Sequence, residues 1–218
     1  MDIKVERNTV VVFDLDDTIY NELDYLKSAY QYIARQIEPA QWQALYAYMI
    51  SLFRSKEDVF GYIADEYGMD KSELLNTYRE HLPSIQPFEG FREVLMAIRD
   101  KKAKVGILTD GRVLTQMNKI RALGIERQID HIAISEAIGT EKPNERNYLV
   151  FENLYKGGAY IYIADNLRKD FLCPNDRGWH TIGKLDNGLN MHHDAFKYFD
   201  NSHKPRTFFN SYLEINIV

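Results

Sequence analysis

Three aspartates follow directly on a fully apolar run near the start of the chain. The run is Val10–Phe13, and Asp14, Asp16 and Asp17 come immediately after it. Clustered carboxylates repel one another and raise one another's pKa, so they add nothing to the stability of a buried strand end. The arrangement becomes favourable when a cation lies among them. Carboxylate oxygens suit Mg²⁺, which takes one or two carboxylates together with waters and substrate phosphate oxygens. The segment therefore predicts a magnesium site, with a solvated acidic turn as the alternative.

A second apolar run ends in a hydroxyl side chain. Thr109 follows Val105–Leu108, and Asp110, Gly111 and Arg112 come next. A hydroxyl group and free backbone N–H groups near the start of a helix form a seat for an anion. This segment predicts an anion-binding turn. A direct contact of Arg112 with substrate is the weaker expectation, because surface arginines are mostly solvated.

Two further segments complete the set of candidate residues. Lys142 stands directly before Pro143, a residue suited to the first position of a helix. The apolar run Tyr160–Ala164 is followed at once by Asp165, and Asp170 comes five residues later. Taken alone, a lysine before a proline is most often a surface residue. It is the order of all four segments that favours a shared site.

These four segments resemble the four motifs of the haloacid dehalogenase (HAD) superfamily of phosphohydrolases. The resemblance implies that Asp14 is the nucleophile, that Asp16 is the general acid/base, and that Lys142 stabilises the phosphoryl group. It implies a phosphate site at Thr109, Asp110, Gly111 and Lys142, and Mg²⁺ held by Asp14, Asp165 and the backbone carbonyl of Asp16. Thr18, Asn166 and Asp170 would support the loop and the metal. Ala164 stands where the family usually has glycine.

The implied chemistry is hydrolysis of a small-molecule phosphomonoester through an aspartyl-phosphate. Asp16 would give a proton to the leaving group and then activate water, which requires surroundings that protonate its carboxyl group. The alternatives are a β-phosphoglucomutase-like phosphotransfer, a phosphonatase using Lys27 or Lys56, and a non-catalytic phosphate-binding protein. A 2-haloacid dehalogenase is disfavoured, since it needs neither Asp16 nor Asp165.

Apolar runs alternating with amphipathic segments predict an α/β fold. We expect a Rossmann-like parallel sheet with helices on both faces, and ligands beyond the carboxyl ends of its strands. The expected strands are Val10–Phe13, Val105–Leu108, Ile132–Ile134, Tyr160–Ala164 and His180–Ile182. Between 21 and 85 only helical periodicity occurs. This division predicts a core of residues 1–20 and 86–182, an inserted all-α domain of 21–85, and a C-terminal extension of 183–218 packed on the core.

In the family that the chain resembles, an insert at this position is the C1 cap, which closes over the site and contributes to specificity. A nucleotide, a sugar phosphate or phosphoglycolate would suit such a site. Asn21, Glu22 and Tyr25 are candidates to face the leaving group. His192, His193 and His203 lack a persuasive metal-ligand spacing, so we expect surface or packing roles for them.

Composition limits the remaining classes. The 218 residues are 45% hydrophobic and carry 27 Lys+Arg against 32 Asp+Glu, a net charge of −5. Without a basic block, nucleic acid and anionic membranes are poor partners. No apolar run approaches a membrane span, and no secretory signal is recognisable. The single cysteine cannot form an internal disulfide. We therefore expect a cytoplasmic monomer or homodimer with a small phosphorylated substrate.

Overall fold

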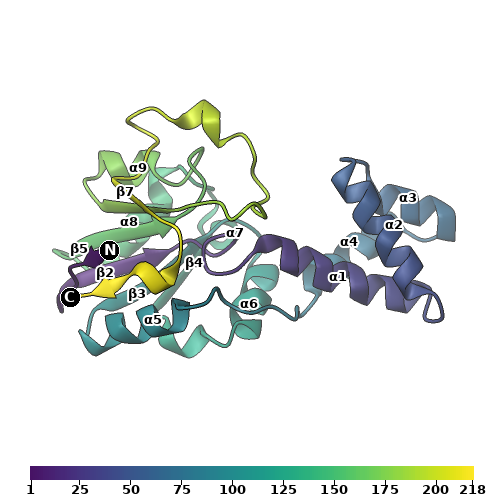
Figure 1. Cartoon of the computed structure of the whole chain (residues 1–218), viewed down its shortest axis with the longest axis horizontal. Coiled ribbons are helices and arrows are strands. Elements are labelled where there is room, and N and C mark those ends of the chain that lie inside the picture. The colour runs from purple at the N-terminus through teal and green to yellow at the C-terminus, as the bar shows by residue number, and fades with distance from the viewer.

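The centre of the molecule is a six-stranded parallel sheet. The computed structural model describes residues 1–218, and the strand order is β4-β3-β2-β5-β6-β7, with every neighbouring pair parallel (Figure 1). The strands are β2 (Thr9–Phe13), β3 (Lys104–Thr109), β4 (His131–Ile134), β5 (Ala159–Ala164), β6 (His180–Lys184) and β7 (Thr207–Phe209). The α/β prediction and all five expected strands are confirmed.

The central strands are apolar throughout because both of their faces are buried. Successive side chains of β2 enter two different hydrophobic clusters. Val11 and Phe13 lie in the cluster under α5 (Phe91–Asp100) and α6 (Val113–Ala122). Val10 and Val12 lie in the cluster under α8 (Glu145–Leu154) and α9 (Leu172–Asp176). The sheet therefore has a helical layer on each face, and because all its strands are parallel, their carboxyl ends lie at one edge.

The helix that follows Lys142 begins later in the chain than the sequence suggests. Pro143 is not its first residue: Asn144 is the N-cap, its side chain accepting a hydrogen bond from the Arg146 N–H at 3.0 Å, and α8 starts at Glu145. An asparagine cap satisfies one free N–H at a helix start, which a proline cannot do. The short helix α7 (Ser135–Ile138) precedes this turn, and a 3-10 helix, η1 (Glu126–Gln128), lies before β4.

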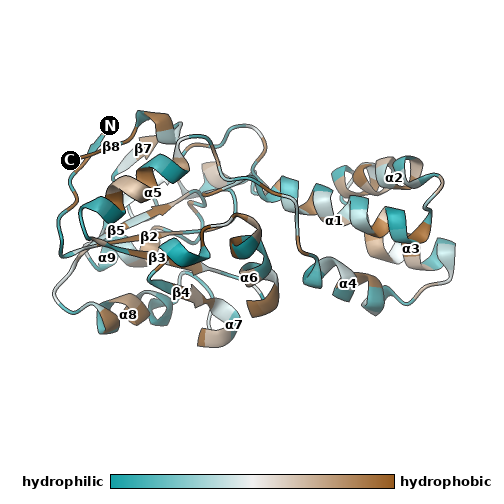
Figure 2. Ribbon diagram, turned by 90° about the horizontal axis from the view of Figure 1, so that it is seen from below, coloured by the Kyte–Doolittle hydropathy of each residue, from teal (hydrophilic) through white to brown (hydrophobic).

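Four helices between β2 and α5 pack around an apolar cluster of their own. They are α1 (Glu22–Ile37), α2 (Trp42–Arg54), α3 (Val59–Tyr67) and α4 (Lys71–Glu80). Tyr30, Ile33, Met49 and Ile63 are among the buried members of that cluster. These helices, called the helical module below, extend away from the sheet edge at which the strands end (Figures 1 and 2). The cluster takes buried residues from each of the four helices, so their apolar faces pack together.

The C-terminal segment adds to the sheet and then returns to the N-terminus. After β6 it forms a long connection with a 3-10 helix, η2 (Ala195–Tyr198), and then the edge strand β7. A last 3-10 helix, η3 (Tyr212–Glu214), leads to β8 (Asn216–Ile217), which pairs with β1 (Asp2–Ile3). Tyr212 is buried, and its hydroxyl donates to the Thr18 carbonyl at 2.9 Å. No helix combines the length and the apolar character that crossing a membrane requires.

Candidate active site

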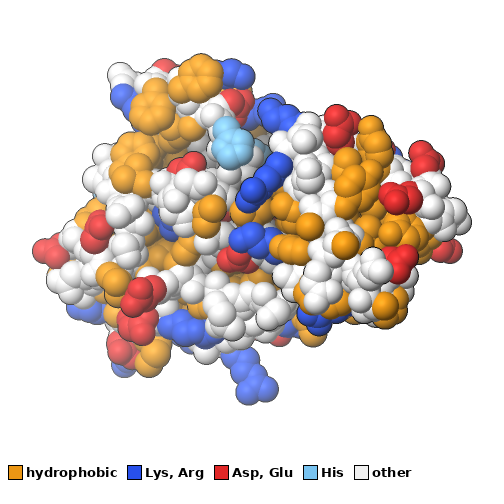
Figure 3. Space-filling view, turned by 45° about the vertical axis from the view of Figure 1, so that its right-hand side comes forward, with side chains coloured by type: hydrophobic (Ala, Val, Ile, Leu, Met, Phe, Trp, Pro, Cys, Tyr) orange, Lys and Arg blue, Asp and Glu red, His pale blue; other side chains and the backbone are white.

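The carboxyl ends of β2, β3 and β5 surround a small cavity of about 110 Å³. All ten side chains that line it are polar or charged. They are Asp14, Asp16, Asp17, Glu22, Thr109, Asp110, Asp165, Asn166, Lys169 and His192. Basic side chains and a histidine gather around a hollow in the surface, where the helical module meets the rest of the molecule (Figure 3). The chemistry of this lining suits an anionic, hydrophilic ligand.

Lys142 connects two of the predicted aspartates. Its buried ammonium group lies 2.7 Å from Asp14 Oδ1 and 2.7 Å from Asp170 Oδ1. It also lies 3.2 Å from the hydroxyl of Tyr162 on β5. Burial alone would lower the pKa of Lys142, but the two carboxylates outweigh burial and raise it well above its usual value. A permanent positive charge therefore lies beside Asp14.

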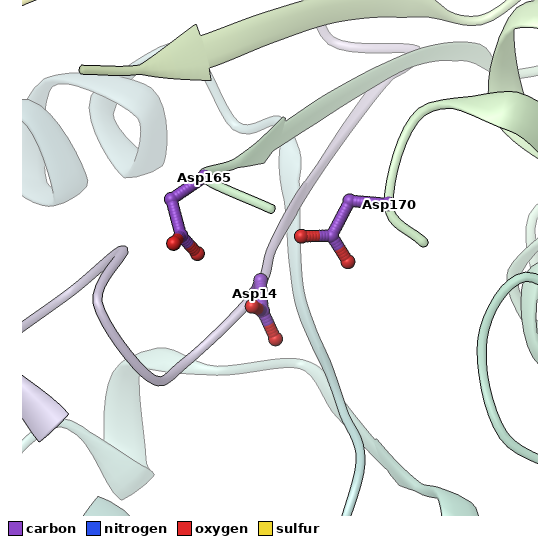
Figure 4. A group of neighbouring side chains, drawn as sticks. All are labelled: Asp14, Asp165 and Asp170. Carbon is purple, nitrogen blue, oxygen red and sulfur yellow. The ribbon is translucent and has the colours of Figure 1, made fainter. Parts of the chain in front are cut away.

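Asp14, Asp165 and Asp170 form a carboxylate cluster. One oxygen of each lies within 4.8 Å of the others, and their carboxyl groups face a common space (Figure 4). Burial and the neighbouring carboxylates raise the pKa of Asp14 to about 7 against the opposing effect of Lys142, and raise that of Asp165 well above its usual value. One lysine does not neutralise three acids. The all-oxygen donor set and this excess negative charge fit a hard divalent cation.

The three aspartates are not equally free to bind a metal. Both oxygens of Asp170 accept hydrogen bonds or ion pairs from the protein, from the Asn166 N–H at 2.9 Å and from Lys142. Asp165 accepts from Thr18 Oγ1 at 3.2 Å and from Asn190 Nδ2 at 2.9 Å. Of these six carboxylate oxygens, Asp14 Oδ2 alone has no hydrogen-bond or ion-pair partner in the protein, since both oxygens of Asp165 and of Asp170 are occupied. Asp170, Thr18 and Asn166 make supporting contacts around it. These supports hold Lys142 and the loop after β5.

Asp16 is surrounded by donors that the sequence did not reveal. Lys119 Nζ on α6 lies 2.8 and 2.9 Å from its two oxygens, Gln116 Nε2 donates at 3.0 Å, and the Tyr20 hydroxyl donates as well. Burial opposes ionisation, but Lys119 and these hydrogen bonds outweigh it and lower the pKa of Asp16. In this conformation the surroundings of Asp16 therefore favour its ionised form, because a lysine from another element lies beside both of its oxygens.

The turn after β3 brings some predicted phosphate ligands to the cavity and turns others away. Thr109 and Asp110 line the cavity, whereas the Gly111 N–H donates to Ser135 Oγ at 2.9 Å and Arg112 is exposed. The Asp110 carboxylate accepts from the Lys142 N–H at 3.1 Å and from Lys169 Nζ at 2.8 Å. Asp110 therefore orients a second ammonium group, Lys169, toward the same cavity.

Further residues complete the lining of the cavity. Glu22, the first residue of α1, faces the cavity, and burial together with Asp16 raises its pKa to about 8. Tyr25 is buried instead, its hydroxyl donating to the Tyr78 carbonyl. Lys169 and His192 reach the cavity from the loop after β5 and from the C-terminal segment. Sequence analysis missed Lys169 and Lys119, and expected only a surface or packing role for His192.

The strand-end carboxylates, the buried lysine and the parallel sheet lie within a stretch of the chain that matches a known protein family. A model of the haloacid dehalogenase-like hydrolases matches residues 11–184. The chain belongs to this family. The match spans all four segments and the helical module between the first two, so the resemblance drawn from the motifs is confirmed.

Several HAD proteins are similar to this chain over most of its length. A glyceraldehyde 3-phosphate phosphatase of Methanocaldococcus jannaschii is 22% identical over 188 residues, covering 79% of this chain and 82% of that protein. The Pyrococcus furiosus protein of the same name is 23% identical over 197 residues, covering 82% and 81%.

Solved structures of HAD proteins share the fold. The magnesium-bound HAD-hydrolase YfnB of Bacillus subtilis superposes with a TM-score of 0.66 at 19% identity, covering 94% of this chain and 96% of that one. A HAD phosphatase from Thermococcus onnurineus gives a TM-score of 0.59 at 17% identity, covering 94% and 95%. At such identities these similarities establish the fold and leave the reaction to the site itself.

Proposed function

We propose that this HAD protein is a Mg²⁺-dependent phosphatase for a small, hydrophilic phosphomonoester. The observation that carries the proposal is the entirely polar cavity of about 110 Å³ in which Asp14 lies beside Lys142. Pockets for drug-sized ligands usually measure roughly 300–1,000 Å³ and are mostly apolar. A phosphoryl group with a short polar leaving group suits this cavity better than a nucleotide, whose base needs an apolar or aromatic wall.

The residues of the chain would divide the reaction between them. Asp14 attacks phosphorus through a carboxylate oxygen, the bond to the leaving oxygen breaks, and an aspartyl-phosphate forms. Lys142 offsets the repulsion between Asp14 and the incoming phosphate. When bound, Mg²⁺ would supply further charge neutralisation, held by Asp14, Asp165 and the backbone carbonyl of Asp16.

Proton transfer would fall to Asp16. Its carboxyl group gives a proton to the leaving oxygen and then takes one from the water that hydrolyses the aspartyl-phosphate. Since Lys119 favours the ionised form, Asp16 becomes protonated only after substrate binding alters these contacts. Thr109 and Asp110 lie at the same edge, and the Thr109 hydroxyl, the Asp110 backbone N–H and Lys142 would bind the phosphoryl group.

The helical module would serve as a cap over this edge. Glu22 brings the first turn of α1 to the cavity, so that a movement of the module changes the wall facing the leaving group. The relatives named above are glyceraldehyde 3-phosphate phosphatases, which makes D-glyceraldehyde 3-phosphate the first compound to assay. Phosphoglycolate, small sugar phosphates and nucleoside monophosphates complete the panel.

The test is inorganic phosphate release with Mg²⁺ across this panel, repeated with EDTA and with Asp14→Asn. We expect release from the smallest polar esters, its loss in EDTA, and a fall of at least about a thousandfold in the variant, because no nucleophile is left. Asp100→Asn, an exposed carboxylate on α5, is the matched control and should retain full activity.

Two outcomes would contradict the proposal. Isomerised sugar phosphate without net phosphate release would indicate a mutase of the β-phosphoglucomutase type. Binding of phosphate without turnover of any ester or phosphonate would indicate a non-catalytic protein.

A further inference from the structure

A loop of the C-terminal segment forms part of the active-site wall. This loop, Leu185–His192, follows β6 and is called the C-terminal loop below. It begins with the Leu185 N–H donating to the Phe209 carbonyl at 2.9 Å, and it ends with His192 at the catalytic cavity. Since the four motif-like segments end at Asp170, nothing in them assigns a role to this loop.

Three hydrogen bonds fasten the C-terminal loop to the catalytic residues and to the module. The Met191 N–H donates to Asp17 Oδ2 at 2.7 Å. Asn190 Nδ2 donates to Asp165 Oδ2 at 2.9 Å. Asn187 Nδ2 donates to Asn21 Oδ1 at 2.9 Å. The loop therefore bridges the ends of β2 and β5 and the start of α1.

Asp17 is the centre of this arrangement. Its other oxygen, Oδ1, accepts the Glu22 N–H at 2.8 Å and so caps α1, whose own N-cap Asn21 makes no side-chain capping bond. Asp17 has a positive φ of 53°, a conformation that aspartate tolerates better than most residues. One buried carboxylate thus fixes the first residue of the module and the end of the C-terminal loop relative to each other.

The loop is also held internally. Asp186 Oδ1 accepts the N–H groups of Gly188 at 2.7 Å and Asn190 at 3.2 Å, and Gly188 has a φ of 86°. Asn190 is 5% exposed, and its Oδ1 has no hydrogen-bond partner although its amide nitrogen is bonded. Asn190 lines a cavity next to the catalytic one, and a buried acceptor without a partner there points to a water or ligand donor.

His192 is placed by these anchors among charged side chains of the cavity. Lys169 and Glu22 line the same space, and the pair of His192 and Lys169 offers hydrogen-bond donors to an oxygen-rich group. His192 also borders a neighbouring cavity of about 210 Å³ that contains apolar residues such as Phe199 and Phe208. His192 therefore stands between the phosphoryl site and this second cavity.

We propose that His192 is a substrate-binding residue that selects the leaving group, donating a hydrogen bond to a hydroxyl or carbonyl oxygen two or three carbons from the phosphate. This rests on the proposed phosphatase function. Lys169 stands beside it as a second donor, and the anchors on Asp17 and Asp165 set its position. The substrate class is a phosphorylated short polyol, hydroxyaldehyde or hydroxyacid.

The test compares His192→Ala with His193→Ala, a neighbour that is likewise exposed but lies outside the cavity. Each variant is assayed with glyceraldehyde 3-phosphate or the best polar ester of the panel. The comparison substrate is p-nitrophenyl phosphate, whose leaving group carries no hydroxyl or carbonyl group besides the oxygen that was bonded to phosphorus. We expect His192→Ala to lower kcat/KM for the polar ester about tenfold, mainly through KM, as loss of one hydrogen bond would. Hydrolysis of p-nitrophenyl phosphate should stay within about twofold. His192→Gln, which keeps a donor, should restore part of the loss.

The outcomes separate this inference from the function on which it rests. Equal losses for both esters in His192→Ala, or no loss for either, would overturn the leaving-group role while the phosphatase function stands. A preference of the wild-type protein for nucleoside monophosphates would also overturn it, since the neighbouring cavity would then hold the leaving group. If the wild-type protein hydrolyses neither ester, the phosphatase function itself is rejected.

Discussion

Asp14, Asp165 and Asp170 have one buried lysine among them, and this imbalance would control how protons compete with the proposed metal for the site. Lys142 stabilises the ionised forms, but burial and mutual repulsion still raise the pKa of Asp14 to about 7 and that of Asp165 well above its usual value. A divalent cation binds the ionised carboxylates. Protons bound to Asp14 and Asp165 would therefore have to leave if the proposed metal entered.

We expect the affinity for Mg²⁺ to fall as the pH drops through about 7, the pKa of Asp14. The sign follows from the raised pKa: below it the carboxyl group is protonated in the metal-free protein, and binding must release that proton. Isothermal titration calorimetry between pH 5.5 and 8.5, in buffers of different ionisation enthalpy, measures both the affinity and the protons released. Asp14→Asn should bind more weakly and release fewer protons. A pH-independent affinity would contradict this account.

The sequence allows a site position to be predicted for residues that stand at the end of an apolar strand. Asp14, Thr109 and Asp165 come directly after apolar runs, and parallel strands bring such positions to one edge. Lys119 and Lys169 carry no comparable signal. Lys119 meets Asp16 across 103 positions of the chain, on the buried side of a helix, so only tertiary packing shows that it belongs to the site.

At the scale of elements, the spacing of apolar residues predicts a helix or strand correctly where that element buries a defined face. It indicated β2, β3, β4, β5 and β6, and the four helices of the module. It gave no indication of β7 and β8, which are short edge strands without a continuous apolar run. Their pairing depends on contacts with distant elements, such as that of Phe209 and Tyr212 with the cluster under α5.

Gly90, the N-cap of α5, lies close against the C-terminal segment. Its φ is +82°, and a Cβ placed there would lie 2.8 Å from the backbone nitrogen of Leu213. Gly157 has a similar φ of +75° with nothing within 4 Å. It therefore provides a control for backbone strain alone.

We expect Gly157→Ala to lower the free energy of unfolding by about 1 kcal/mol, through the strained φ. Gly90→Ala should cost roughly 1–3 kcal/mol more, because η3 must move away from α5. Urea unfolding of both variants measures the difference. Equal losses would mean that the C-terminal segment shifts without cost and is not firmly packed there.

At the scale of the whole molecule, α6 connects the catalytic edge with the helical module. Gln116 and Lys119 hold Asp16, while two other residues of the same helix hold the end of α4. Thr115 Oγ1 donates to the Arg79 carbonyl at 2.8 Å, and Asn118 Nδ2 donates to the Glu80 carbonyl at 2.9 Å. These carbonyls lie in the last turn of a helix, where they lack intrahelical partners. The core thus supplies hydrogen bonds that fix the exit of the module.

Asn118→Ala should therefore loosen the module more than it destabilises the core. The Glu80 carbonyl loses its partner, so the linker that follows α4 becomes more mobile, and amides such as Ser84 and Phe88 should exchange with deuterium faster. Hydrogen-exchange mass spectrometry measures this, with Leu114→Ala, an exposed position on the same helix, as the control. KM for the polar ester should rise severalfold, because Glu22 and the start of α1 move with the module. Faster exchange throughout the sheet, with no excess in residues 81–88, would show instead that Asn118 serves global stability and that α6 does not set the position of the module.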